Sequence, residues 1–282
     1  SGPGQEPALT VSYESMRFLK LMERIRMPRI MPMLVAVLVA LPSVLSAQTA
    51  LFDATVIYEK YLGVDQPVFA EYFNMLNQKY EGTDATGWGI YYETPTVSYR
   101  LTAVPAESGM EGVVEVLNER NLGFQEFTEP QRELWATAWA SRRQAVYFAL
   151  PELAYLPDDI SAETLQANPY SRVQIYHVRP TEMQNFEDAL ARRGELDRSL
   201  GIDNLILRVY RGGMGTPAPV YMLRFHAESQ EADALGLAER QAARQGIMEE
   251  WRATNRAMSE AARHVEVFVN YRRNELSRSA NR

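Results

Sequence analysis

The hydrophobic and polar positions of residues 173–273 follow the order strand, helix, strand, strand, helix, strand. Strands are indicated where apolar and polar residues alternate, and helices where apolar residues recur every three or four positions. The last helical segment is long, and Gly246 marks a change in its phase. Apolar and polar residues alternate, as in strands, at residues 173–178, 205–211, 220–226 and 265–271.

Residues 55–150 repeat this order of elements with a different sequence. Residues 106–108 and 227–229 both read Ala-Glu-Ser, and Tyr99 and Tyr221 each begin a Tyr-x-Leu triplet at the same point of the two units. We interpret the two stretches as an internal duplication, mainly because of the common element order. Capping boxes, in which the first and fourth residues bond each other's backbone N–H groups, predict helix starts at Ser108, Thr128 and Thr181.

The N-terminal region has the order of a secretory signal peptide. Arg24, Arg26 and Arg29 precede the apolar residues 33–41, and small residues follow at 44–47. The alternative is an uncleaved anchor, because residues 30–52 carry no charged side chain and are long enough to span a bilayer. Either interpretation predicts an exported chain, periplasmic or secreted.

The predicted boundaries place two units on either side of a proline-containing linker. Residues 1–47 are an upstream extension and signal peptide, 48–155 the first unit, 156–170 the linker, 171–276 the second unit and 277–282 a tail. After residue 47 the chain holds 24 basic and 33 acidic residues, a net charge of −9, which argues against nucleic-acid binding. The chain has no cysteine, which excludes thiol catalysis and Cys-ligated metals.

A strand–helix–strand–strand–helix–strand unit is the ferredoxin-like arrangement, with one antiparallel sheet and both helices on one face. Two such units in one chain resemble the dimeric α/β-barrel superfamily, over about residues 55–273. The resemblance implies an α+β fold in which two four-stranded sheets pack face to face, so we expect a monomer with an internal pseudo-dimer. Members include cofactor-independent monooxygenases, haem-handling enzymes and decyclising isomerases, so the resemblance implies little about chemistry.

Alternation assigns the strand residues to two faces. In the second unit the set expected under the helices is almost wholly apolar: Leu205, Leu207, Val209, Tyr221, Leu223, Phe225, Val265, Val267 and Val269. The opposite set is polar: Gln174, Tyr176, Ile206, Arg208, Tyr210, Met222, Arg224, His226, Glu266, Phe268 and Asn270. Its counterpart in the first unit is Glu59, Tyr91, Glu93, Ser98, Arg100, Thr102 and Tyr147.

Two interpretations of the polar face stay open. It could line a cavity in which Arg208 and Arg224 bind an anionic or oxygen-rich ligand. It could instead be an ion-paired interface, with Glu59 or Glu93 bonded to those arginines, since buried polar groups must be paired in either case. The candidate ligand-binding residues are Tyr176, Arg208, Tyr210, Arg224 and His226.

No catalytic, metal or cofactor motif is recognisable in the sequence. His177 and His226 end neighbouring antiparallel strands and are expected at opposite ends of the sheet, so a shared metal is not predicted. His264 follows the long helix, where a cation suits the helix dipole. His226 remains a candidate general base or axial haem ligand.

The predicted function is therefore broad. The first hypothesis is an exported, non-enzymatic protein whose fused barrel binds a small organic molecule or a partner. The alternative is a cofactor-independent monooxygenase or isomerase that acts in the cleft between the sheets, using the same polar residues.

Overall fold

The computed structural model describes residues 54–157, 160–217 and 219–279. The predicted signal peptide and the anchor alternative lie outside these residues. Within them, no helix has the length and apolar character needed to cross a membrane.

Both units have the predicted element order. The first unit consists of β1 (Ala54–Leu62), α3 (Gln66–Lys79), β2 (Gly89–Thr94), β3 (Val97–Pro105), α4 (Gly109–Gln125), α5 (Glu129–Thr137) and β4 (Ser141–Ala149). The short helix α6 (Ala162–Ala167) follows in the linker. The second unit consists of β5 (Tyr170–Val178), α7 (Met183–Ser199), β6 (Ile206–Gly212), β7 (Val220–Ala227), α8 (Gln230–Ala243), α9 (Met248–Ala261) and β8 (Ala262–Arg272).

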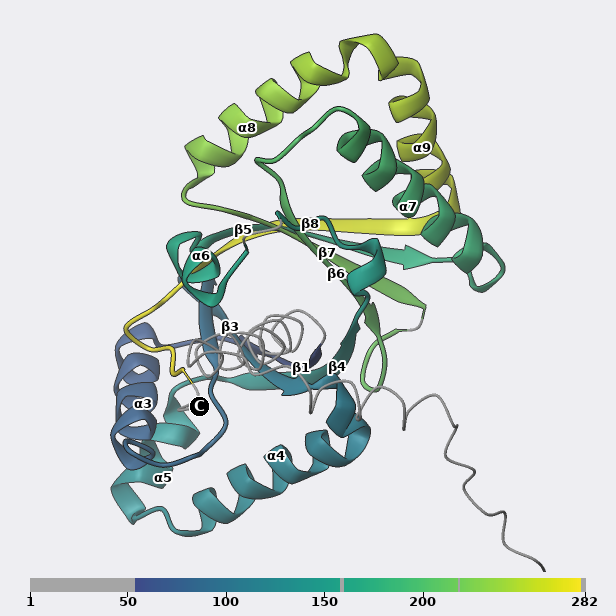
Figure 1. Cartoon of the computed structure of the whole chain (residues 1–282). Helices are drawn as coiled ribbons and strands as arrows, with labels where there is room; N and C mark the ends of the chain where they lie inside the picture. Colours follow the sequence, from purple (N-terminus) through teal and green to yellow (C-terminus); the bar gives the residue numbers. More distant parts are fainter. Residues whose placement is uncertain (1–53, 158–159, 218, 280–282) are drawn as a thin grey trace, which may run out of the picture. The chain divides into compact units, whose positions relative to one another are not determined.

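The strands close into an eight-stranded antiparallel barrel in the order β1-β3-β2-β8-β5-β7-β6-β4. Each unit contributes four adjacent strands, and the helices lie outside the barrel, three long helices from each unit (Figure 1). Pairing within a unit runs along whole strands, whereas β2 and β8 pair only at Tyr91–Arg272 and Tyr92–Tyr271. The predicted α+β fold of two fused ferredoxin-like units is confirmed.

Of the three predicted capping boxes, only the one at Thr128 forms. The Thr128 backbone N–H donates to Gln131 Oε1 at 2.9 Å, as a capping box requires. Ser108 makes no such cap, because it ends a 3-10 turn and has helical backbone angles. Thr181 lies inside the 3-10 turn Pro180–Glu182, where Pro180 fixes φ and starts the helical turn early. The predicted break at Gly246 is confirmed, since a 3-10 turn, Arg244–Ile247, separates α8 from α9.

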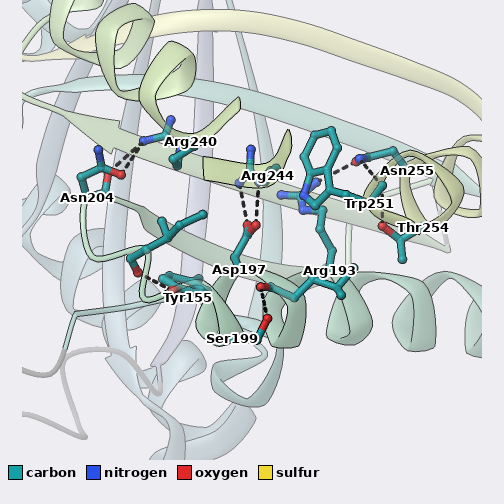
Figure 2. A network of polar contacts seen from close by, with 12 residues as sticks. Tyr155, Arg193, Asp197, Ser199, Asn204, Arg240, Arg244, Trp251, Thr254 and Asn255 are labelled. Carbon is teal, nitrogen blue, oxygen red and sulfur yellow. Dashed lines mark hydrogen bonds and ion pairs between the residues drawn. The ribbon is translucent and has the colours of Figure 1, made fainter. Parts of the chain in front are cut away.

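A buried ion pair fixes this break against α7 (Figure 2). Arg244 donates from Nε and Nη2 to the two carboxylate oxygens of Asp197, both at 2.7 Å. Arg244 is 3% exposed and Asp197 1%. The guanidinium also lies 4.4 Å from the ring centroid of Trp251 on α9. One arginine thus connects the 3-10 turn, α7 and α9.

The apolar side chains form cores on both sides of the sheet. Outside the barrel, β6, β7 and α7 enclose one core, and β1, α3 and α5 another. Inside the barrel lies a third cluster with five tyrosines: Tyr58, Tyr91, Tyr99, Tyr147 and Tyr210. Tyr99 is inside the barrel while Tyr221 is in an outer core, so the matching Tyr-x-Leu triplets do not occupy equivalent positions.

Candidate functional site in the barrel interior

The face prediction is wrong for β5. Tyr176 lies under α7, with its ring 5.1 Å from that of Phe186, and its hydroxyl donates to Gln174 at 3.1 Å. Val173 and Ile175 face the barrel interior instead. Apolar residues occupy both faces of this strand, so alternation alone could not fix its orientation. Tyr176 is therefore not beside the other candidate residues.

The face prediction is also wrong for part of the first unit. Glu59, which is 1% exposed, lies on the helix side, where Arg120 of α4 approaches at 2.9 Å and Arg142 at 3.1 Å. Arg100 is 3.7 Å from Glu59, and Arg120 also bonds Thr102. The Glu59 carboxylate therefore pairs on the outer side of the sheet, and the considered pair with Arg208 or Arg224 does not form. Glu93 lies 3.9 Å from Lys60.

The remaining candidates meet inside the barrel around Arg224 on β7. Its Nη2 donates to Ser171 Oγ on β5 at 3.2 Å and to Asn270 Oδ1 on β8 at 3.4 Å. Ser171 Oγ is also 3.2 Å from His226 Nδ1. Arg224, Ser171 and Asn270 are each at most 1% exposed. Three neighbouring strands thus place a guanidinium, a hydroxyl, an amide and an imidazole together.

Two further arginines and two tyrosines complete this group. Arg208 on β6 is directly opposite Arg224 on β7 in the strand register, and its Cζ lies 5.2 Å from the ring centroid of Tyr210. Arg272 of β8 is opposite Tyr91 of β2. The Cζ of Arg224 lies 4.4 Å from the centroid of the Tyr91 ring. We call Tyr91, Ser171, Arg208, Tyr210, Arg224, His226, Asn270 and Arg272 the arginine cluster.

Six buried polar atoms in or beside the arginine cluster have no hydrogen-bond partner among the described residues. Native proteins pair nearly all such atoms with protein, water or ligand. Because most of the six are donors, the group is suited to an acceptor-rich molecule. They are Tyr99 Oη, Tyr210 Oη, Arg224 Nε, His226 Nε2, Asn270 Nδ2 and Arg272 Nε.

The electrostatic field of the cluster is positive. The pKa of His226 is well below its usual value, first because of burial and then because of the charges of Arg224 and Arg208. For Tyr91, burial is the largest single influence and raises the pKa, but Arg224, Arg272 and Arg208 together outweigh it and the net pKa is lowered. The cluster therefore favours neutral imidazole and negatively charged oxygen.

Aromatic rings form the wall next to the cluster. Tyr58 packs against Tyr99 and Tyr147 with ring centroids 5.3 and 5.6 Å apart. Tyr99 stacks on Phe268 at 5.6 Å. Burial raises the pKa of Tyr58 and Tyr147, the latter to about 12, so both hydroxyls are neutral near pH 7. The interior thus offers flat apolar surfaces beside a cationic group.

Several of these residues are not among the candidate ligand-binding residues predicted from the sequence. Tyr91 and Asn270 belong to the predicted polar face but not to the predicted site, and Arg272 belongs to neither. Tyr58, Tyr99 and Ser171 had no signal of their own, because their proximity depends on which strands meet across the barrel. The alternation of β8 would have placed Arg272 on the same face as Asn270.

The other two histidines lie away from the cluster. His177 Nε2 is 2.7 Å from Glu266 Oε1, and the rings of His177 and His264 are 5.5 Å apart. In the register of β5 and β7, His177 is opposite Val220 while Ser171 is opposite His226, so six residues of β5 separate the two histidines. Among the described residues, no group of three His, Cys, Asp or Glu side chains is arranged to hold a metal ion.

The barrel, its order of strands and its duplicated units define the dimeric α/β-barrel fold, here with both halves in one chain. No family model matches the sequence, and no curated protein matches it. Among solved structures, the fold is similar to an "anthrone oxidase-like protein", with a TM-score of 0.53 and 15% identity over 82% of this chain and 94% of that one. It is also similar to a "putative monooxygenase" of Fusobacterium nucleatum subsp. nucleatum ATCC 25586, with a TM-score of 0.50 and 6% identity over 82% and 96% of the chains. At these identities the similarity concerns the fold.

Proposed function

We propose that the barrel interior binds a small organic anion at the arginine cluster. The observation that carries this proposal is the isolation of Arg224. Its side chain is 1% exposed, and among the described residues no carboxylate oxygen lies within 4.0 Å of its nitrogens. A buried guanidinium is costly unless an opposite charge accompanies it. Ser171 and Asn270 supply only neutral acceptors.

The chemistry of the neighbouring groups indicates what kind of anion would fit. Arg224, Arg272 and Asn270 each have an N–H group that makes no hydrogen bond to any described residue. These groups can donate to a carboxylate or to the oxygen of an enolate or phenolate. The rings of Tyr99 and Phe268 suit a planar apolar body. An eight-stranded barrel has room inside for side chains and at most one small ligand. We therefore infer an aromatic carboxylate or phenolate.

Native mass spectrometry of the purified chain, compared with the denatured mass, tests whether a ligand is retained. Calorimetric titration with 2-naphthoate and with the neutral isostere 2-naphthamide then tests charge recognition. We expect the acid to bind and the amide to bind at least about tenfold more weakly, a difference of about 1.4 kcal/mol. Arg224→Met should remove this preference. Equal binding of both probes, or no binding by either, would refute the proposal.

A second candidate function is a cofactor-independent oxidation in the same site, and His226 is the observation that favours it. The imidazole is neutral at pH 7, and its Nε2 lies buried beside three arginines with no hydrogen-bond partner in the described part of the chain. A neutral imidazole can take a proton from an acidic C–H group, and the arginines would stabilise the enolate that forms. Reaction of that enolate with O₂ would convert a CH₂ group to a carbonyl with release of water.

Oxygen consumption with anthrone as the probe tests this candidate. We expect one O₂ consumed per anthrone oxidised, and His226→Gln should lower kcat by about 10²–10⁴-fold with a smaller effect on KM. The calorimetric test with 2-naphthoate does not depend on this result. If 2-naphthoate binds and the chain does not accelerate oxidation above the uncatalysed rate, the binding function stands and the oxidation of anthrone is refuted.

A further inference from the structure

Strand β8 extends far beyond its partner on the first-unit side of the barrel. Its pairing with β5 runs from Ala262 to Tyr271, but its pairing with β2 is limited to Tyr271 and Arg272. After residue 272 the chain continues beside β2, where Arg273 N–H donates to Ile90 O at 2.8 Å. Residues 263–269 therefore have a strand on one side only among the described residues.

The backbone register shows which groups of β8 face this open edge. Arg272 N–H donates to Pro169 O on the β5 side, while Arg273 N–H donates toward β2. Because N–H groups alternate in direction along a strand, those of Val265 and Val267 point to the open edge. The side chains there are accessible: Val267 is 60% exposed, and His264 and Glu266 are also exposed. Val267 is therefore not covered by the helices, contrary to the face prediction.

The equivalent strand of the first unit, β4, is protected at the corresponding edge. The loop after β6 covers it, since Gly213 N–H donates to Val146 O and Val146 N–H donates to Met214 O, both at 2.8 Å. Gly215, with a φ of +80°, lets this loop lie against the Gln144 carbonyl, where a Cβ atom would be 2.5 Å away. Exposed Arg142 and Arg143 follow on the same strand. Charge and coverage are the usual protections of an edge strand.

We propose that the open edge of β8 pairs with β8 of a second copy of this chain, antiparallel about a two-fold axis at Val265. The same edge of a second copy can form an antiparallel ladder with it and needs no other structural element. Because such a contact is two-fold symmetric, it is complete in a dimer. This surface is separate from the sheet faces, whose internal pairing led to the expectation of a monomer.

The side chains that face each other across the two-fold axis select the register. A two-fold axis at Val265 places His264 opposite Glu266 of the other copy, twice, and keeps all pairs inside the open segment. An axis at Glu266 would set two carboxylates directly opposite each other, which is destabilising. An axis at Val267 would require Tyr271, which already pairs with Tyr92 of β2. The short contact predicts a weak dimer with a micromolar dissociation constant.

Disulfide trapping tests the axis directly, because the chain contains no cysteine. Hydrogen-bonded residues of antiparallel strands have Cα atoms about 5.5 Å apart, within the range of a disulfide of about 4.4–6.8 Å. Val265→Cys should therefore give a covalent dimer under mild oxidation. The control Leu235→Cys, at a site on α8 that is 66% exposed, should stay monomeric.

Sedimentation velocity over a concentration series measures the same association in the unmodified chain. Val267→Lys sets a lysine opposite Arg263 of the other copy and should raise the dissociation constant at least tenfold, about 1.4 kcal/mol. Leu235→Lys, the same kind of change at a similarly exposed site, should leave it unchanged. A chain that stays monomeric, a dimer that Val267→Lys leaves intact, or a Val265→Cys variant that does not cross-link would overturn the proposal.

Discussion

Two arginines of similar burial should respond differently to the same substitution. Arg224 is 1% exposed and Arg244 is 3% exposed, but Arg244 has both of its bonds to the Asp197 carboxylate while Arg224 has neutral acceptors. Methionine replaces either side chain with an apolar one of similar length. Comparing the two variants therefore measures how much a buried carboxylate partner contributes to the effect of removing an arginine.

The magnitudes follow from what each substitution leaves behind. Arg244→Met leaves the buried Asp197 carboxylate without its counter-charge, and breaking such a pair lowers the free energy of unfolding by about 3–5 kcal/mol. Arg224→Met loses two hydrogen bonds, which are long at 3.2 and 3.4 Å, and a contact with Tyr91 of at most about 2 kcal/mol. It also removes a desolvation penalty of several kcal/mol. We expect these contributions to cancel to within about 1 kcal/mol.

Urea unfolding followed by tryptophan fluorescence measures both variants. With an m-value of about 3 kcal/mol/M, a difference of about 3 kcal/mol separates the two midpoints by about 1 M. Arg224→Met should unfold near the wild-type midpoint and no longer prefer 2-naphthoate to 2-naphthamide. A loss of stability equal to that of Arg244→Met would show that Arg224 has a structural counter-charge, and the inference of an anion site would fail.

Three further predictions concern other parts of the chain. Folding lowers the pKa of His226, so on acidification the unfolded chain takes up the proton before the folded chain does. The free energy of unfolding should therefore be independent of His226 above about pH 6.5 and should decrease as the pH falls below that value. His226→Gln should flatten this slope in urea titrations between about pH 5 and 7, and an unchanged slope would contradict the assignment. Glu59→Gln should lower the free energy of unfolding by about 3–5 kcal/mol, because Arg120 and Arg142 lose their shared carboxylate, and a loss below about 1 kcal/mol would refute this account. Expression in a secreting host should yield a chain whose N-terminal sequence begins at Gln48, whereas retention of residues 30–47 would favour the anchor.

The sequence was sufficient for the architecture because element order depends on local periodicity. Two successions of the same six elements predicted the two sheets, and the phase change at Gly246 predicted the separation of α8 and α9. Face assignment was less secure wherever a strand carried apolar residues on both sides. Val56 and Ile57, for example, are both buried, one in the barrel and one under α4, so neither marks the orientation of Glu59.

The candidate site was only partly accessible to sequence reasoning. Arg208, Tyr210, Arg224 and His226 share one face of adjacent strands, so alternation alone brings them together. Tyr91 comes from the other unit, and its place beside Arg224 depends on closure of the barrel between β2 and β8. No pattern within either unit contains that information.

The fusion of both halves in one chain determines the symmetry of the barrel interior. In a dimer of identical subunits every interior residue occurs twice, and a two-fold axis through the barrel would duplicate or bisect any site. Here Arg224 and His226 come from the second unit and Tyr91 from the first, so the arrangement is directional. The proposed aromatic anion, which has one charged end, would thus be held in one orientation, and one molecule per chain is expected. Each half is also free to change without altering the other, which a symmetric dimer cannot do.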